Sequence, residues 1–235
     1  MHEVLQKFFS PHSFRVAFPD VWFGFQLNLK LMIVSEILVL ILALGIAVIR
    51  GLPGRGAAPL RALAIIYTDI FRGTPLILVA FLVGFGLPGL NIRIISTQSL
   101  FAYGVISLTL VYTAYVTEVY RAGIESVHPS QRMAARSIGL NYWQSMRYVV
   151  IPQAVRRVIP PLLNDFVGLQ KDTALVTVIG VAEAAQQAQQ FSQNNYNFTS
   201  YVDAAVLFIL LTIPLARFTD HLIAVRERRE RAQAS

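Results

Sequence analysis

Five long apolar stretches dominate this sequence, and they constrain its fold more than any other feature. They run over about 25–49, 63–85, 100–119, 155–180 and 201–225. Each is close to the roughly 20 residues that a helix needs to cross a hydrocarbon layer of about 30 Å. Only 14% of the 235 residues are charged, whereas soluble domains have about 25%. Because a lipid-embedded backbone must satisfy its hydrogen bonds internally, we expect an all-α integral membrane protein with five transmembrane helices.

The basic residues predict how these helices are oriented. Fourteen arginines fall in three loops, at 50–61, 120–157 and 217–231. The segments on the opposite side hold only Lys7, Arg15 and Arg93. Because arginine and lysine are retained in cytoplasmic loops, we expect the N-terminus outside and the C-terminus in the cytoplasm.

This orientation divides the chain into three parts. Residues 1–24, rich in aromatic side chains, are expected to form an external interfacial segment. Residues 25–225 are expected to form the transmembrane domain, with a cytoplasmic element at about 120–157. Residues 226–235 form a charged cytoplasmic tail, which we expect to contact anionic lipid. The formal net charge of +7 therefore reports orientation, and no nucleic-acid partner is expected.

The cytoplasmic element has the local signals of a helix-turn-helix. A short helix can begin after Ser130, with Ser130 as its N-cap. Gly139 suits the left-handed position that ends such a helix. Asn141 can cap a second helix, and Gln144 three residues later completes a capping-box pattern.

Small residues mark one side of the first helix of this element. Ala134 lies one turn from Ile138, and Ala135 lies one turn from Gly139, so each pair shares a face. Arg132 and Arg136 form a separate basic edge. Such a face either packs against the helices of this chain or lets the backbone of a partner come close.

The small residues also belong to a longer pattern. Its members are Ala134, Ala135, Gly139, Ile151 and Pro152. This pattern resembles the "EAA" signature of permease subunits from ABC importers, Glu-Ala-Ala-x3-Gly-x9-Ile-x-Leu-Pro. Met133 stands where the signature has Glu, and only the end of the last block is kept. The segments 71–75 and 169–175 resemble motifs of the polar amino-acid branch of these permeases.

The resemblance implies a fold and a function. The fold would be that of a type I ABC importer permease, a multi-pass protein of the bacterial plasma (inner) membrane. The function would be to form the substrate path of an ATP-driven importer of polar amino acids such as histidine, glutamine or arginine. Residues 130–152, called here the coupling element, would contact the ATPase. The residues implied for this contact are Ser130, Ala134, Ala135, Arg136, Gly139, Ile151 and Pro152.

The resemblance also implies partners. A second permease chain, identical or different, would complete the path, and two ATP-binding subunits would hold ATP and magnesium. An external substrate-binding protein would deliver the amino acid, and membrane lipid would surround the assembly. A basic, an acidic and an amide substrate all fit the resemblance equally.

Polar residues within the apolar stretches are the candidates for the substrate path. Ionisable groups inside membrane helices are expensive and are therefore functional candidates. Arg72 and Lys171 could face the carboxylate of an amino acid, and Asp165 or Asp172 could face its ammonium group. Thr74 joins this set because Pro75 breaks the second stretch beside it. Alternatively, these charges pair with one another and stabilise broken helices.

Sequence signals for enzymatic chemistry are missing. The chain has no Gly-x4-Gly-Lys-Ser/Thr loop, no His-Glu-x-x-His and no Gly-x-Ser-x-Gly elbow. It has no cysteine, so it has neither disulfides nor thiolate metal ligands. We therefore expect a transport subunit without catalytic residues, metal site or cofactor of its own. The alternatives are a self-sufficient secondary amino-acid transporter, against which the missing internal repeat argues, and a membrane scaffold.

Overall fold

The computed structural model describes the backbone of residues 2–234 and the side chains of 3–225 and 228. The regular structure of the described residues is entirely helical, without strands. The elements are α1 (His2–Phe8), α2 (Pro11–Gly51), α3 (Ala58–Gly73), α4 (Leu76–Phe81), η1 (Leu82–Gly86), α5 (Leu87–Gly89), α6 (Arg93–Ser96), α7 (Leu100–Glu125), α8 (Pro129–Ser137), α9 (Tyr142–Ser145), η2 (Met146–Val150), α10 (Ile151–Asp172), η3 (Thr173–Ile179), α11 (Ala184–Asn195) and α12 (Thr199–Ala234). The predicted lipid contact of the tail arginines falls almost entirely outside the described side chains.

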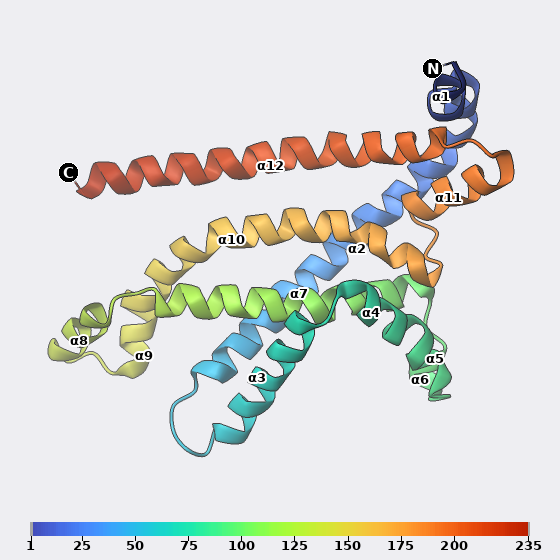
Figure 1. The fold of residues 1–235 in the computed structure, drawn as a ribbon. Coiled ribbons are helices and arrows are strands. Elements are labelled where there is room, and N and C mark those ends of the chain that lie inside the picture. The colour runs from blue at the N-terminus through green and yellow to red at the C-terminus, as the bar shows by residue number, and fades with distance from the viewer. Residues whose placement is uncertain (1, 235) are drawn as a thin grey trace.

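Helix α7 is the centre of the molecule. It contacts α2, α3 and α10, and α10 in turn contacts α12 (Figure 1). The largest buried cluster joins α7 to α2, to α4 and to the short helix η3; it includes Leu31, Val79, Leu108 and Val176. The elements α8 and α9 project beyond the end of α7 at one end of the molecule (Figure 1).

Three helical segments are long and apolar enough to cross a membrane. These are Glu3–Gly51, Leu100–Glu125 and Thr199–Val225, and the bent pair α3 and α4 makes a fourth if it counts as one span. Most of the fourth expected stretch lies in α10 and the rest in η3; α10 is not among these segments, and its 22 residues include five charged ones. The structure therefore supports a helical membrane protein with three or four of the five expected spans.

The first long helix begins earlier than expected. Helix α2 starts at Pro11 and runs without a break to Gly51, although the first span was expected from Phe25. The Ser10 hydroxyl accepts a hydrogen bond from the Ser13 amide at 3.3 Å, and Pro11 occupies the first turn, where its missing N–H costs nothing. Most of the aromatic segment is thus the start of the first span helix.

Two breaks interrupt the membrane helices. At the first, Thr74 is extended before Pro75, and α4 leaves α3 at 106°. This confirms the predicted break at Pro75 and agrees with the restricted backbone of a residue before proline. At the second break, α10 passes into η3, which ends at Gly180 with φ +83°.

The two breaks pack on each other. A β-carbon at Gly84 in η1 would lie 2.5 Å from Cγ2 of Ile179 in η3, so only glycine permits this approach. Val83 and Ile179 are both buried in the same cluster. Irregular backbone in a membrane protein persists where other protein covers it, and each break here supplies that cover for the other.

Candidate transport cleft and coupling element

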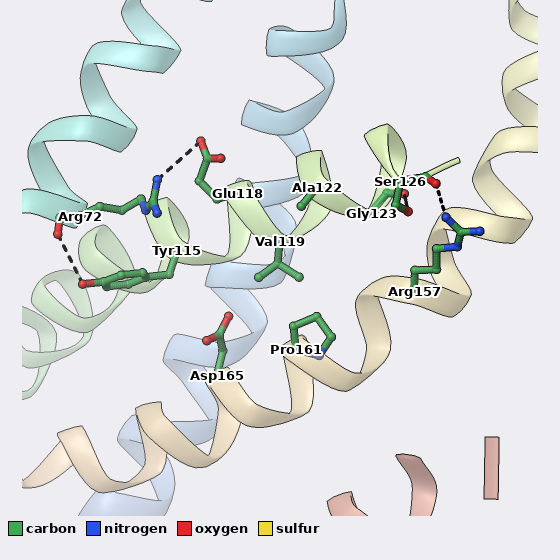
Figure 2. A pocket seen from close by; sticks show the side chains of 10 residues that line it. All are labelled: Arg72, Tyr115, Glu118, Val119, Ala122, Gly123, Ser126, Arg157, Pro161 and Asp165. Carbon is green, nitrogen blue, oxygen red and sulfur yellow. Dashed lines mark hydrogen bonds and ion pairs between the residues drawn. The ribbon is translucent and has the colours of Figure 1, made fainter. Parts of the chain in front are cut away.

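A cleft of about 400 Å³, lined by charged and apolar side chains, opens beside the C-terminal half of α7. Its lining comes from the end of α3, from α7 and from α10 (Figure 2). The lining residues are Arg72, Tyr115, Glu118, Val119, Ala122, Gly123, Ser126, Arg157, Pro161 and Asp165. The cleft therefore carries charges of both signs among helices that are otherwise largely apolar.

Two of the five substrate-path candidates line this cleft. Figure 2 shows Arg72 reaching it from the end of α3 and Asp165 reaching it from α10. Among the described residues, Oδ2 of Asp165 is buried and has no hydrogen-bond partner. A cation and a carboxylate in one cleft match the two charged groups of an α-amino acid. Their contact with substrate stays a prediction.

The other three candidates lie apart from the cleft lining. The Thr74 hydroxyl donates to the Ile70 carbonyl at 2.8 Å and so gives one of the last carbonyls of α3 a hydrogen bond. The Asp172 carboxylate accepts a hydrogen bond from the Tyr112 hydroxyl at 2.8 Å. Lys171 is exposed. Each of the first two therefore has a structural contact at a helix break, and their roles in a substrate path stay predictions.

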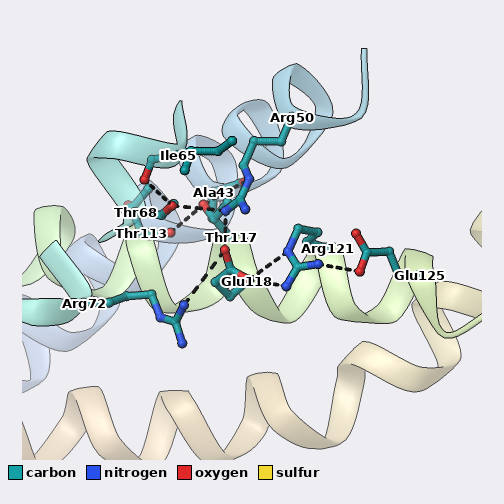
Figure 3. Close-up of polar contacts among 10 residues, drawn as sticks. All are labelled: Ala43, Arg50, Ile65, Thr68, Arg72, Thr113, Thr117, Glu118, Arg121 and Glu125. Carbon is teal, nitrogen blue, oxygen red and sulfur yellow. Dashed lines mark hydrogen bonds and ion pairs between the residues drawn. The ribbon is translucent and has the colours of Figure 1, made fainter. Parts of the chain in front are cut away.

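Among the residues that line the cleft, Glu118 has the most ion-pair partners (Figure 3). It is paired with Arg50 at the end of α2, and its Oε2 lies 2.7 Å from the Arg121 guanidinium. Arg72 approaches its Oε1 at 4.0 Å. The i, i+3 spacing of Glu118 and Arg121 in the sequence fits the ion pair that the structure forms, but it gives no sign of the pair with Arg50. The Glu118 side chain is 16% exposed, and the decisive partner, Arg50, comes from a distant helix.

A second polar cluster holds the junction between η3 and α11. The Asn28 side-chain amide donates to Thr173 Oγ1 at 3.1 Å and to Glu183 Oε2 at 3.0 Å. Its carbonyl accepts from the Ala184 amide at 3.0 Å. Glu183 also accepts from the Ala185 and Gln186 amides as the N-cap of α11. Sequence reasoning missed this cluster; the one available signal was an Asn inside the first apolar stretch.

The coupling element forms the predicted helix-turn-helix, with one correction at its start. Pro129 occupies the first turn of α8, so His128 is the N-cap. The expectation that Ser130 would be the N-cap is therefore wrong. The His128 Nδ1 accepts a hydrogen bond from the Ser130 amide at 3.2 Å. A proline is well suited to this first position, and its presence moves the cap ahead of it.

The turn and the second helix form as predicted. Gly139 has φ +91°, and the following amide of Leu140 donates to the Ala135 carbonyl at 3.1 Å. Asn141 and Gln144 form a reciprocal capping box, with both hydrogen bonds at 2.9 Å. Local chemistry thus fixes the shape of the coupling element.

The face of small residues is divided between the inside and the outside. Ala135 is buried against its own chain, whereas Ala134, Arg136 and Gly139 are exposed. Beside them, Ile138 is 79% exposed and Trp143 is 65% exposed. Ile151 and Pro152 are exposed at the start of α10. Large apolar side chains exposed on a polar element outside the apolar helices are typical of a protein-docking surface.

Within the described residues, no group of three or more His, Cys, Asp or Glu side chains could hold a metal ion. The site thus consists of a charged cleft among membrane helices and an exposed apolar element at their end. Neither part contains the paired acid and base, or the activated nucleophile, of an enzyme site.

Several known proteins are similar to this chain in sequence and in fold. It is 36% identical over 165 residues to a probable glutamine ABC transporter permease of Bacillus subtilis, covering 70% of this chain and 74% of the relative. It is 33% identical to the arginine transport system permease ArtQ of the same organism, covering 86% and 92%. A crystal structure of an amino acid ABC transporter with histidines matches with a TM-score of 0.79, at 32% identity and coverage of 90% and 94%.

A more distant solved structure shares the fold alone. An inward-facing MetNI methionine ABC transporter matches with a TM-score of 0.73 at 19% identity, covering 88% of this chain and 95% of that one.

Residues 43–225 match the family described as binding-protein-dependent transport system inner membrane component. The chain therefore belongs to this family and is a permease subunit of an ABC importer, a transport component and not an enzyme.

Proposed function

We propose that this chain forms the substrate path of an ATP-driven importer of polar amino acids in the bacterial plasma membrane. It spans the membrane five times, with the N-terminus outside and the C-terminus in the cytoplasm. The arginine-rich loops at 50–61, 120–157 and 217–231 support this orientation, because they lie on one side of the five expected spans.

The exposed apolar surface of α8 and α9 is the observation that carries the proposal. Ile138 and Trp143 project from an element whose shape is fixed by Gly139 and by the Asn141 capping box. A rigid apolar surface beyond the ends of the membrane helices requires a partner that covers it. Since the chain belongs to the permease family of ABC importers and has no nucleotide-binding loop of its own, that partner is an ATP-binding subunit, and ATP and magnesium bind there.

The remaining partners follow from the same proposal. A second permease chain faces the cleft of this one, two ATP-binding subunits dock on the two coupling elements, and an external binding protein delivers the amino acid. Arg72 and Asp165 support an amino acid as the substrate, because one cleft offers a cation to a carboxylate and a carboxylate to an ammonium group. Closure of the ATP-binding subunits moves the coupling elements and switches the cleft between the two sides of the membrane.

The experiment is purification of this chain from its native membrane in mild detergent, followed by mass spectrometry and reconstitution into vesicles. We expect an ATP-binding subunit in the purified complex. We also expect ATP-dependent uptake of at least one of labelled glutamine, arginine and glutamate, which represent amide, basic and acidic substrates. Recovery of the chain alone, with uptake driven by an ion gradient and unaffected by ATP, would instead establish a secondary transporter, which the relatives do not favour.

A further inference from the structure

Two arginines from different elements bind the C-terminal end of α7. The Arg132 guanidinium in α8 donates to the Ile124 carbonyl at 2.7 Å. The Arg157 guanidinium in α10 donates to the Ser126 carbonyl (Figure 2). We call these two residues the α7 arginine pair. The sequence places Arg132 only on a basic edge with Arg136, and it does not single out Arg157.

The pair satisfies groups that a helix leaves without partners. The last carbonyls of a helix have no intrahelical donor, and the partial negative charge at this end favours a cation. The Ile124 carbonyl otherwise accepts from the Ser126 amide at the helix cap and, at a long 3.4 Å, from the Val127 amide. A charged donor makes a shorter and stronger hydrogen bond than a neutral one. The α7 arginine pair therefore fixes this helix end to two neighbouring elements.

The hydrogen bonds of the α7 arginine pair differ from the apolar contacts where α7 meets α8, η2 and α10. Val127, Val150 and Ala154 form a small apolar cluster that also joins α7 to η2 and α10. Apolar contacts are non-directional and allow one element to slide on another. A hydrogen bond weakens steeply when its angle or distance changes, so the arginine bonds fix the register of α7 against α8 and α10.

The position of the pair connects the two parts of the site. Arg132 lies in the coupling element, and within the described residues it supplies the hydrogen bond that joins α8 to α7. Arg157 and Ser126 line the cleft, as does Glu118 two turns earlier in α7. A displacement of α8 is therefore passed to the helix that forms the cleft wall.

We propose that Arg132 and Arg157 are positioning residues that transmit movement of the ATPase-docked coupling element to α7 and so to the transport cleft. This inference rests on the proposed function, because it requires an ATP-binding subunit on the coupling element. Without the pair, ATP hydrolysis continues on the partner while the cleft no longer follows it. The complex then hydrolyses ATP without a matching uptake of substrate.

The test is the number of amino acids taken up per ATP hydrolysed by the reconstituted complex. The variants are Arg132→Gln and Arg157→Gln, measured with whichever of glutamine, arginine and glutamate the wild-type complex transports. Arg156→Gln is the matched control, because Arg156 is exposed beside Arg157 and makes no hydrogen bond or ion pair among the described residues. Arg132→Lys keeps one charged donor and should recover much of the lost uptake.

We expect both Gln variants to retain the ATP-binding subunit and to lose about tenfold in uptake per ATP, the scale of one charged hydrogen bond. The control should match the wild type. An unchanged ratio in both assembled Gln variants would overturn the inference. A residue with only a structural role would lower assembly and ATP hydrolysis together and leave the ratio unchanged.

Two further outcomes are distinguishable from that result. If Arg132→Gln does not assemble, Arg157→Gln decides the question, since Arg157 lies outside the coupling element. If the wild-type complex itself contains no ATP-binding subunit, the proposed function fails, and with it the basis of this inference.

Discussion

Arg50, in the last turn of α2, donates a hydrogen bond to the carboxylate of Glu118 in α7, 68 residues later in the chain. The same carboxylate binds Arg121 on its own helix, so Glu118 joins two helices through one side chain. When one partner of a largely buried ion pair is removed, the other charge stays without an opposite charge. The protein then loses more stability than when a surface ion pair is removed.

We expect Glu118→Gln to destabilise the purified chain by about 2 kcal/mol. Thermal unfolding in detergent measures this effect. Glu125→Gln is the control, since Glu125 is 61% exposed and its pair with Arg121 contributes less than about 1 kcal/mol. A double-mutant cycle with Arg50→Met should show coupling between Arg50 and Glu118, and strictly additive effects would contradict the prediction.

Gly123 controls how closely α7 and α10 approach each other. A β-carbon there would overlap Cγ1 of Val158, so Gly123→Ala must push α10 away from α7. We expect a loss of about 1–3 kcal/mol in stability, and recovery when Val158→Ala is added. Gly45→Ala is the matched control, because nothing lies within 4 Å of that position. Failure of Val158→Ala to recover stability would show that the contact is not the cause.

Gly139→Val should weaken docking of the ATP-binding subunit. The residue has φ +91°, which a β-branched side chain resists, so the turn between α8 and α9 would have to change. Gly139→Asn is the control, since Asn tolerates this conformation better than other residues. Co-purification of the ATP-binding subunit is the measurement, and undiminished recovery with Gly139→Val would refute the prediction.

The Asn28 cluster makes a prediction about the junction between η3 and α11. Asn28→Leu removes three hydrogen bonds at once and leaves the buried carboxylate of Glu183 without its side-chain donor. We expect a loss of about 2–4 kcal/mol in stability, measured by thermal unfolding in detergent. Adding Glu183→Gln should reduce this loss, because the group left without its donor is then uncharged. A neutral effect of Asn28→Leu would show that the cluster contributes nothing net.

Labelling of introduced cysteines checks the orientation. The chain has no cysteine, so a single substitution provides the only thiol. Gln193 and Ser130 are both exposed, on elements at opposite sides of the expected membrane. Gln193→Cys should react with an impermeant thiol reagent added to intact cells, and Ser130→Cys should react only after the membrane is permeabilised. The reverse pattern would overturn the proposed orientation.

Features encoded within a few residues were accessible from the sequence. The break at Pro75, the left-handed Gly139 and the Asn141 capping box each follow from local backbone chemistry, and the structure contains all three. The prediction of Ser130 as an N-cap was wrong for a reason that is also local: the preceding proline already occupies the first turn. Local rules therefore work where competing local signals are weighed together.

Contacts between distant segments could not be read from the sequence. Arg50 is 68 residues from Glu118, and Asn28 is 155 residues from Glu183. Many polar residues in the apolar stretches are equally plausible partners until the packing of the helices is known. The cleft shows the same limit: of the five candidates, the structure places Arg72 and Asp165 in its lining, and it gives Thr74 and Asp172 other contacts.

The bend between α3 and α4 has a consequence for how the chain is made. Helix α3 has 16 residues and is about 24 Å long, which is too short to cross a hydrocarbon layer of about 30 Å by itself. Its continuation, α4, turns away at 106° and packs on η3, whose residues are synthesised about a hundred positions later. The packing that covers this bend can therefore form only after residues 173–179 have been synthesised.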